Sequence, residues 1–121
     1  METKDHVVSL EAAKRLKEIG VDQLSEFMWM QVNGEWDIYY HIDRRFSAMS
    51  QAEWEAAVRT GCAAFLVTEL IAILGDNFGV LDHLRNGQWG CYIPNDCGVN
   101  GIADTPADAL AALVEILHDR E

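Results

Sequence analysis

Near the start of the chain, apolar residues are spaced as in an amphipathic helix. Apolar residues recur every three positions between Ser9, which can cap the N-terminus, and Gly20, which can end the helix. The apolar stripe consists of Leu10, Ala13, Leu16 and Ile19. We expect residues 1–7, which come before this helix, to be a flexible N-terminus.

A β-hairpin is predicted next. Two β-prone runs, residues 27–32 and 35–40, flank Asn33-Gly34. Asn-Gly favours a two-residue turn with positive φ at both positions, and such a turn fixes the register of the strands. One face of the hairpin is almost free of charge and is the predicted core face: Phe27, Trp29, Gln31, Trp36, Ile38 and Tyr40. The opposite face mixes Met and Tyr with acids, so we expect it to meet solvent or a partner.

A long helical stretch follows over residues 51–74. It opens on a capping box, in which Ser50 is followed three residues later by Glu53. Gly61 is expected to divide or bend it. Its second part, residues 64–74, is apolar nearly all round and is the predicted most buried helix.

A second Asn-Gly, at Asn86-Gly87, predicts a second hairpin. A two-residue turn would give the pairs Val80–Ile93, Asp82–Cys91 and Leu84–Trp89. Asp82 would then be the one charged residue on an apolar face, and this conflict weakens the predicted register there. The two hairpins share the pattern Asn-Gly-x-Trp-x-x-Tyr. Shared hairpin chemistry explains the echo, and a degenerate duplication is the alternative.

The chain ends on a loop and a helix. Residues 95–104 are rich in Gly, Asn and Asp and predict a loop. Thr105 then provides an N-cap and Pro106 a first helical residue for a helix that runs to about His118. The predicted fold is α+β, in the order α-ββ-α-ββ-α. It is a two-layer domain, with a four-stranded antiparallel sheet and three or four helices on one face.

Composition and charge narrow the class of partner. The 121 residues include 9 Lys and Arg against 20 Asp and Glu, for a net charge of −11, and half are hydrophobic. This predicts a single domain over residues 1–121. The acidic balance argues against nucleic acid and against an anionic membrane surface, since both bind Lys and Arg. Residues 1–59 carry net −4 and residues 60–121 net −7. The acidic second half is either a solvated face or a surface offered to a basic partner.

The cysteines and the N-terminus predict a cytoplasmic protein. Cys62, Cys91 and Cys97 make an odd number, which is typical of reduced thiols rather than of a disulfide framework. The polar, acid-containing N-terminus does not match a signal peptide. The longest apolar stretch is too short to span a bilayer.

Four segments resemble a group of small uncharacterised phage and prophage proteins. They are VSLEAAKRLKEIG at residues 8–20, VTELI at 67–71, QWGCY at 88–92 and TPADALAAL at 105–113. Together with the aromatic hairpin they cover about half of the chain. The chain departs from the group over residues 50–62, an added helical piece, and at Phe65-Leu66, where a proline is common. The resemblance implies a mobile-element origin and an α+β fold, but no activity and no functional residues.

Catalytic signatures are absent from the sequence. It contains no GxSxG, no GxxxxGK[ST], no HExxH and no CxxC pair. We therefore predict no catalytic residue, no cofactor and no metal site. The pair of residues that comes closest to a catalytic motif is His41 with Asp43. His83 is a further candidate for a small enzyme or ligand-binding site.

The outward strand faces provide the predicted interaction surface: Met28, Met30, Asp37, Tyr39, His41, His83 and Tyr92. Met and Tyr are enriched at protein interfaces. An ordinary surface, a contact with another protein or a second copy, and a small-ligand platform all remain open. The function that fits best is an acidic protein-binding module without catalytic activity, acting through this face or through the acidic second half. The alternatives are a small ligand-binding protein or enzyme using His41, Asp43 and His83, and a minor structural protein of a phage.

Overall fold

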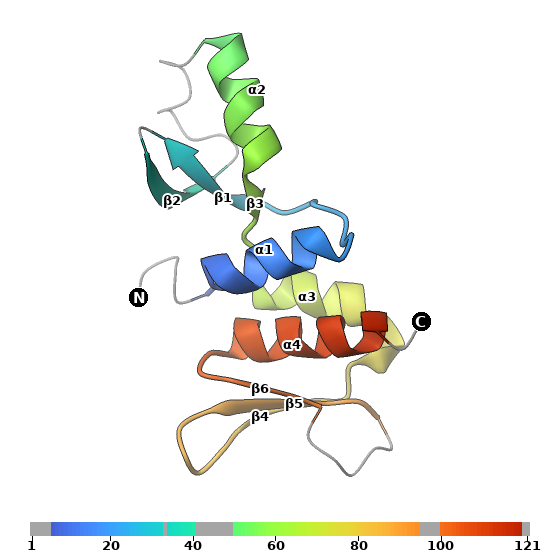
Figure 1. The fold of residues 1–121 in the computed structure, drawn as a ribbon. Coiled ribbons are helices and arrows are strands. Elements are labelled where there is room, and N and C mark those ends of the chain that lie inside the picture. Colours follow the sequence, from blue (N-terminus) through green and yellow to red (C-terminus); the bar gives the residue numbers. More distant parts are fainter. Residues whose placement is uncertain (1–5, 33, 41–49, 95–99, 120–121) are drawn as a thin grey trace.

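A computed structural model describes residues 6–32, 34–40, 50–94 and 100–119 (Figure 1). The fold is α+β, as predicted. In chain order the elements are α1 (Leu10–Glu18), β1 (Phe27–Val32), β2 (Glu35–Tyr40), α2 (Gln51–Thr60), β3 (Cys62–Ala63), α3 (Val67–Leu74), the 3₁₀ turn η3 (Gly75–Asn77), β4 (Val80–His83), β5 (Trp89–Tyr92), β6 (Gly101–Ala103) and α4 (Pro106–Asp119).

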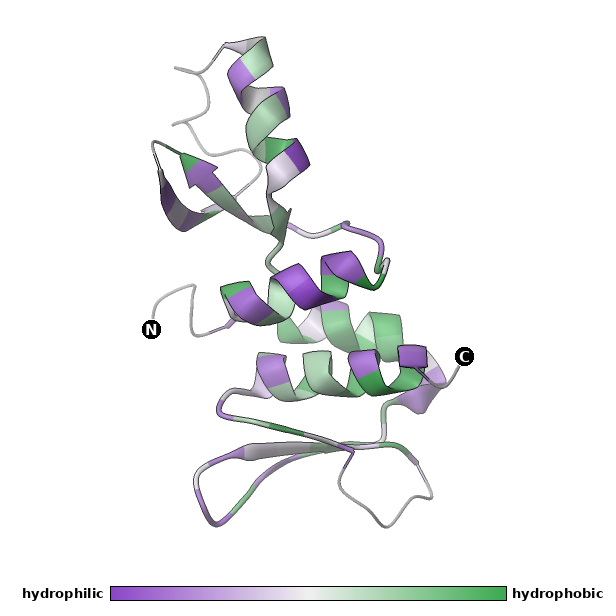
Figure 2. Ribbon diagram, viewed as in Figure 1, coloured by the Kyte–Doolittle hydropathy of each residue, from purple (hydrophilic) through white to green (hydrophobic). Residues whose placement is uncertain are grey.

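The strands form two separate antiparallel sheets of three strands each. Their orders are β2-β1-β3 and β4-β5-β6. The predicted single four-stranded sheet is wrong, because each hairpin is completed by its own short strand instead of pairing with the other hairpin. Helices α1, α3 and α4 lie between the two sheets, and α2 packs against β1 beyond the first sheet (Figure 1). Hydrophobic residues gather along α3 and α4, in the middle of the molecule (Figure 2).

The first hairpin has the predicted register. Met30 pairs with Asp37 and Met28 with Tyr39 across the Asn-Gly turn. Gly34 has φ +81°, which is the left-handed conformation that such a turn requires.

The second hairpin is shifted by one residue from the predicted register. Leu81 pairs with Cys91 and His83 with Trp89. Its connection is longer than two residues, because the amide of Leu84 donates to the carbonyl of Gln88 at 2.7 Å. The shift pairs Leu81 instead of Asp82 with the buried Cys91, so Leu81 packs against the core and the exposed Asp82 lies on the opposite face of the sheet.

The predicted helical stretch over residues 51–74 is interrupted by five buried residues, 61–65, which include β3. Helix α3 begins only at Val67, where the carboxylate of Glu69 accepts from the amide of Leu66 at 2.8 Å. The same carboxylate accepts from the hydroxyl of Ser25 at 2.7 Å. It thus connects the start of α3 to the segment that leads into β1.

Helix α4, not the helical segment predicted at residues 64–74, is the most buried helix. Six of its residues are buried: Ala107, Ala109, Leu110, Ala111, Leu113 and Val114. It lies directly on β6, a strand within the region predicted to be a loop. A Cβ on Gly101 would lie 2.5 Å from the carbonyl oxygen of Ala109, so the backbones of β6 and α4 can approach this closely only at a glycine.

The N-terminal segment is part of the fold from Val7 onward. Val7 is buried and forms a β-bridge with Leu66. The amide of Ser9 donates to the carboxylate of Asp108 at 2.7 Å, and its hydroxyl caps α1 as predicted. The flexible segment predicted for residues 1–7 therefore does not include Val7, and residues 1–5 lie outside the described residues.

Candidate functional site

The predicted interaction residues do not share one open face. Met28, Met30, Asp37 and Tyr39 belong to the first sheet, whereas His83 and Tyr92 belong to the second. His41 lies outside the described residues.

The Met and Tyr face of the first sheet is covered by α2. Met30 is 1% exposed and Tyr39 is 7% exposed, and both pack with Ala57 of α2. Met28 is half-buried against the same cluster. The expectation that this face meets solvent is wrong, because the sequence does not show that α2 lies on this side of the sheet while α1 lies on the other.

The predicted core face of the same hairpin does face the central helices. The indole nitrogen of Trp29 donates to the carbonyl of Val8 at 2.9 Å, and Trp29 packs against the main core. The ammonium of Lys14, on α1, lies 4.8 Å from the centre of the Trp36 ring. Both faces of the first sheet therefore contact helices.

Helix α4 covers the inner face of the second sheet, and no helix of the described residues lies on its outer face. Leu81, Cys91 and Gly101 are neighbours on the inner face, toward α4. The residues that point the other way form a surface that we call the outer β-face: Val80, Asp82, Leu84, Gly90, Tyr92 and Ile102.

Apolar side chains dominate the outer β-face. Val80 is 54% exposed and Ile102 is 48% exposed. Gly90 lies between them and is buried, because a Cβ there would be 3.3 Å from the Tyr92 hydroxyl and 3.5 Å from the Leu84 methyl carbons. Tyr92 and Leu84 thus close over the glycine and form the centre of the face. Of the predicted interaction residues, Tyr92 is the one that this face contains.

His83 does not join the predicted constellation with His41 and Asp43, which both lie outside the described residues. Its ring stacks on Trp89, with the centroids 4.6 Å apart. Asp82 points to the opposite face of the strand. An imidazole in this position extends the aromatic surface of Trp89.

Two of the cysteines are buried and poorly suited to act as nucleophiles. Burial raises the pKa of the Cys91 thiol to about 11 and also raises the pKa of Cys62, where the nearby Lys17 and Lys14 oppose the effect. The thiolate is the reactive form, so a raised pKa disfavours reaction. Cys91 lies on the core face, as predicted; Cys97 is outside the described residues. Within residues 6–32, 34–40, 50–94 and 100–119, no group of three or more His, Cys, Asp or Glu could hold a metal ion.

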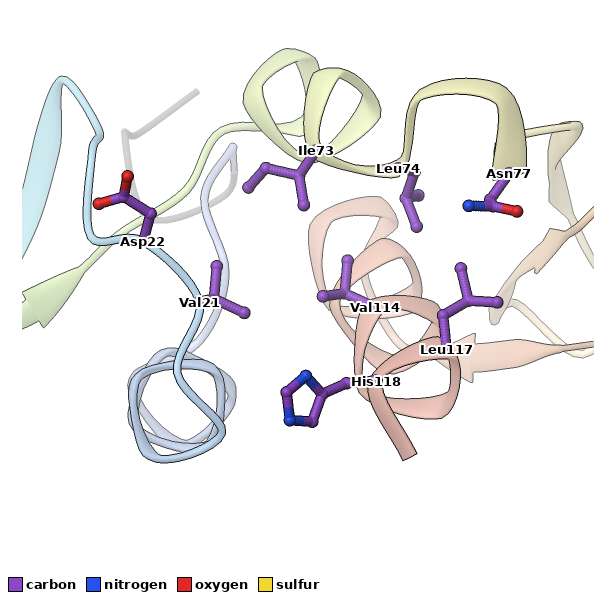
Figure 3. Close-up of a pocket in the computed structure, with 8 residues that line it drawn as sticks. All are labelled: Val21, Asp22, Ile73, Leu74, Asn77, Val114, Leu117 and His118. Atoms are coloured by element: carbon purple, nitrogen blue, oxygen red, sulfur yellow. The ribbon is translucent and has the colours of Figure 1, made fainter. Parts of the chain in front are cut away.

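A cavity of about 280 Å³ opens where three helices end (Figure 3). We call it the helix-end cavity, and its lining residues are Val21, Asp22, Ile73, Leu74, Asn77, Val114, Leu117 and His118. Sequence reasoning did not find it, because its lining comes from three distant segments and no local motif marks it.

Comparison of the chain with protein-family models, with curated proteins and with solved structures finds no match. The resemblance to phage and prophage proteins therefore stays a prediction. None of the helices in the described part of the chain has the length and apolar character needed to cross a membrane.

Proposed function

We propose that this protein is a binding module that recognises a basic protein surface through the outer β-face. The observation that carries the proposal is the contrast between the sheets. The first sheet buries its outward Met and Tyr residues under α2, whereas no described helix covers Val80, Tyr92 and Ile102 on the second.

The arrangement of side chains on the outer β-face resembles the anatomy of protein interfaces. Tyr92 and Leu84 form an apolar centre over Gly90, and exposed Val80 and Ile102 extend it across all three strands. A core of aromatic and aliphatic residues with a polar rim is typical of a protein contact. These residues provide the hydrophobic part of the binding energy.

Charge supports a cationic partner. The outer β-face lies in the half of the chain that carries net −7. Exposed Asp82 sits next to Gly90 on this face, and exposed Asp104 directly follows β6, while Arg85 on the turn is the cation nearest in sequence. Complementary charge speeds encounter and selects the partner. A second copy of this acidic chain would be repelled, so a basic partner fits better than a homodimer.

The proposal can be tested with a short alternating Lys-Leu peptide titrated into the labelled protein and followed by NMR. We expect the largest shift changes at the amides of Val80, Tyr92 and Ile102, and weaker binding as salt is raised, because salt screens the charge attraction. An alternating Glu-Leu peptide of the same length should not bind.

Two variants that each introduce one positive charge provide a matched comparison for this titration. Ile102→Lys should reduce peptide binding at least tenfold, whereas Ile73→Lys, at a comparably exposed isoleucine outside this face, should have less effect. Equal loss in both variants, or shift changes that map elsewhere, would contradict the proposal. If sedimentation detects a dimer and its contacts include Ile102, the partner of this face is a second copy of the chain and not a basic protein.

A further inference from the structure

We infer that the helix-end cavity binds a small apolar molecule with a positively charged end, such as an alkylammonium ion. This site is distinct from the outer β-face, and the inference does not depend on the proposed function. It rests on the shape of the cavity, on its apolar walls and on the direction of three helices.

The walls of the cavity are mostly apolar and continue into the main core. Leu74 is 4% exposed and Val114 is 7% exposed, and both are members of the main core. Val21, Ile73 and Leu117 complete the apolar lining (Figure 3). The apolar part of a ligand would therefore replace water against a preformed hydrophobic surface.

The size of the cavity limits the ligand to a small molecule. Its volume of about 280 Å³ exceeds the roughly 150 Å³ of a cavity that holds benzene. It lies at the lower end of the range of about 300–1,000 Å³ that is typical of pockets for drug-sized ligands. A chain of about six carbons with one polar group fits this space.

The helix ends at the cavity favour positive charge. Helices α1, α3 and α4 run in the same direction, so their C-terminal ends lie on the same side of the molecule (Figure 1). The lining follows these ends: Val21 comes shortly after α1, Leu74 is the last residue of α3 and His118 lies in the last turn of α4. The C-terminal end of a helix carries the equivalent of about half a negative charge, and three such ends reinforce one another.

The polar groups at the rim agree with this preference. Asp22 and Asn77 are exposed and lie at opposite ends of the cavity, with apolar side chains between them (Figure 3). The Asp22 carboxylate is a hydrogen-bond acceptor with negative charge, so it can accept from an ammonium group. An ammonium at the Asp22 end would place an alkyl chain along Val114 and Leu117.

The experiment is a titration of the protein with hexylammonium, hexanol and hexanoate, which share one chain length and differ in charge. Binding is followed by the methyl NMR signals of Ile73, Val114 and Leu117. We expect hexylammonium to bind more tightly than hexanol and hexanol more tightly than hexanoate. Hexanoate binding as tightly as hexylammonium would overturn the inference, as would three titrations without shift changes at these methyl groups.

Two variants separate filling of the cavity from loss of charge. Ile73→Trp should fill the mouth and lower hexylammonium affinity at least tenfold, whereas Ile102→Trp, at a similarly exposed isoleucine on the outer β-face, should leave it unchanged. Asp22→Asn should lower hexylammonium affinity about threefold and leave hexanol binding unchanged. Unchanged hexylammonium affinity in both Ile73→Trp and Asp22→Asn would overturn the inference, even if one of them were less stable.

Discussion

The two sheets carry the same short pattern, Asn-Gly-x-Trp-x-x-Tyr, in opposite surroundings. In both, the tryptophan faces the central helices: Trp36 lies under Lys14 of α1, and Trp89 packs against the main core. In both, the tyrosine points away from them. Tyr39 is buried beneath α2, whereas Tyr92 lies on the outer β-face. The pattern thus defines a hairpin with an inner and an outer side, and other elements decide whether the outer side is covered.

The topology of the two sheets also differs. In the first, the third strand follows α2 and pairs with the first strand of the hairpin; in the second, it precedes α4 and pairs with the second strand. A duplicated unit would have the same topology twice. The difference therefore favours shared hairpin chemistry as the origin of the echo.

The two sheets should differ most in how much stability is lost when the tyrosine of each is removed. Tyr39→Ala should lower the free energy of unfolding by about 3 kcal/mol, because it leaves a cavity under α2. Tyr92→Ala should cost less than about 1 kcal/mol, since its side chain is only partly buried. Urea denaturation measures both values.

Tyr39→Phe is the control for this pair, because it keeps the ring and removes only the hydroxyl. It should retain most of the stability lost in Tyr39→Ala. Equal losses in Tyr39→Ala and Tyr92→Ala would contradict the distinction between a covered and an uncovered sheet face.

The buried thiol of the second sheet should make stability depend on pH. The folded-state pKa of Cys91 is raised to about 11, while an unfolded cysteine ionises near a pH of about 8.5. The stabilisation is complete below about pH 8.5 and is lost as the pH rises toward 11, because only the unfolded state releases its proton in that window. At about 1.4 kcal/mol per pKa unit, this difference corresponds to roughly 3 kcal/mol.

The measurement is urea denaturation from neutral to alkaline pH, compared with Cys91→Ala. The variant starts from lower stability but should lose less of it as the pH rises. Cys62→Ala is the comparison in the first sheet, where Lys17 and Lys14 oppose the rise in pKa, so it should change the slope less. If the stability of the wild-type protein and of Cys91→Ala falls equally with rising pH, the pH dependence does not come from the Cys91 thiol.

The smallest expected effect concerns the contact of the first sheet with α1. Lys14→Met keeps most of the alkyl chain but removes the cation over Trp36, and should lower stability by about 0.5 kcal/mol. Arg85→Met, which removes an exposed cation from the turn of the second hairpin, should change stability less. Differential scanning calorimetry of both variants checks the difference, and an equal or larger loss in Arg85→Met would argue against the cation–π contact.

The elements with a strong local signal were predicted from sequence. Ser9 and Ser50 both cap helices, because a hydroxyl placed just before a helix satisfies a free amide wherever the helix then packs. The first hairpin also has the predicted register, since its Asn-Gly turn joins the two strands directly. In the second, the longer connection shifts every pair by one, and the misplaced Asp82 was the signal of that error.

The other incorrect predictions concern residues whose position depends on packing between segments that are distant in the sequence. Residues 62–65 look helical because they continue an apolar run, yet Cys62–Ala63 form β3 beside β1 and the helix begins only at Val67. Met30 and Tyr39 look outward because nothing near them in sequence indicates that α2 returns over their face. The helix-end cavity and the outer β-face depend on how whole elements are placed, and periodicity cannot show this.

The buried segment of residues 61–65 also affects how the sequence can vary. It leaves α2 through Gly61, where a Cβ would lie 2.7 Å from the carbonyl oxygen of Trp29, and it reaches the main core at Phe65, which accepts from the amide of Val8 at 3.0 Å. Side chains alternate along an extended strand, so a one-residue insertion would turn every one of them to the wrong side. Changes in chain length during evolution should therefore fall in the connections at the surface, while the length of this short link stays fixed.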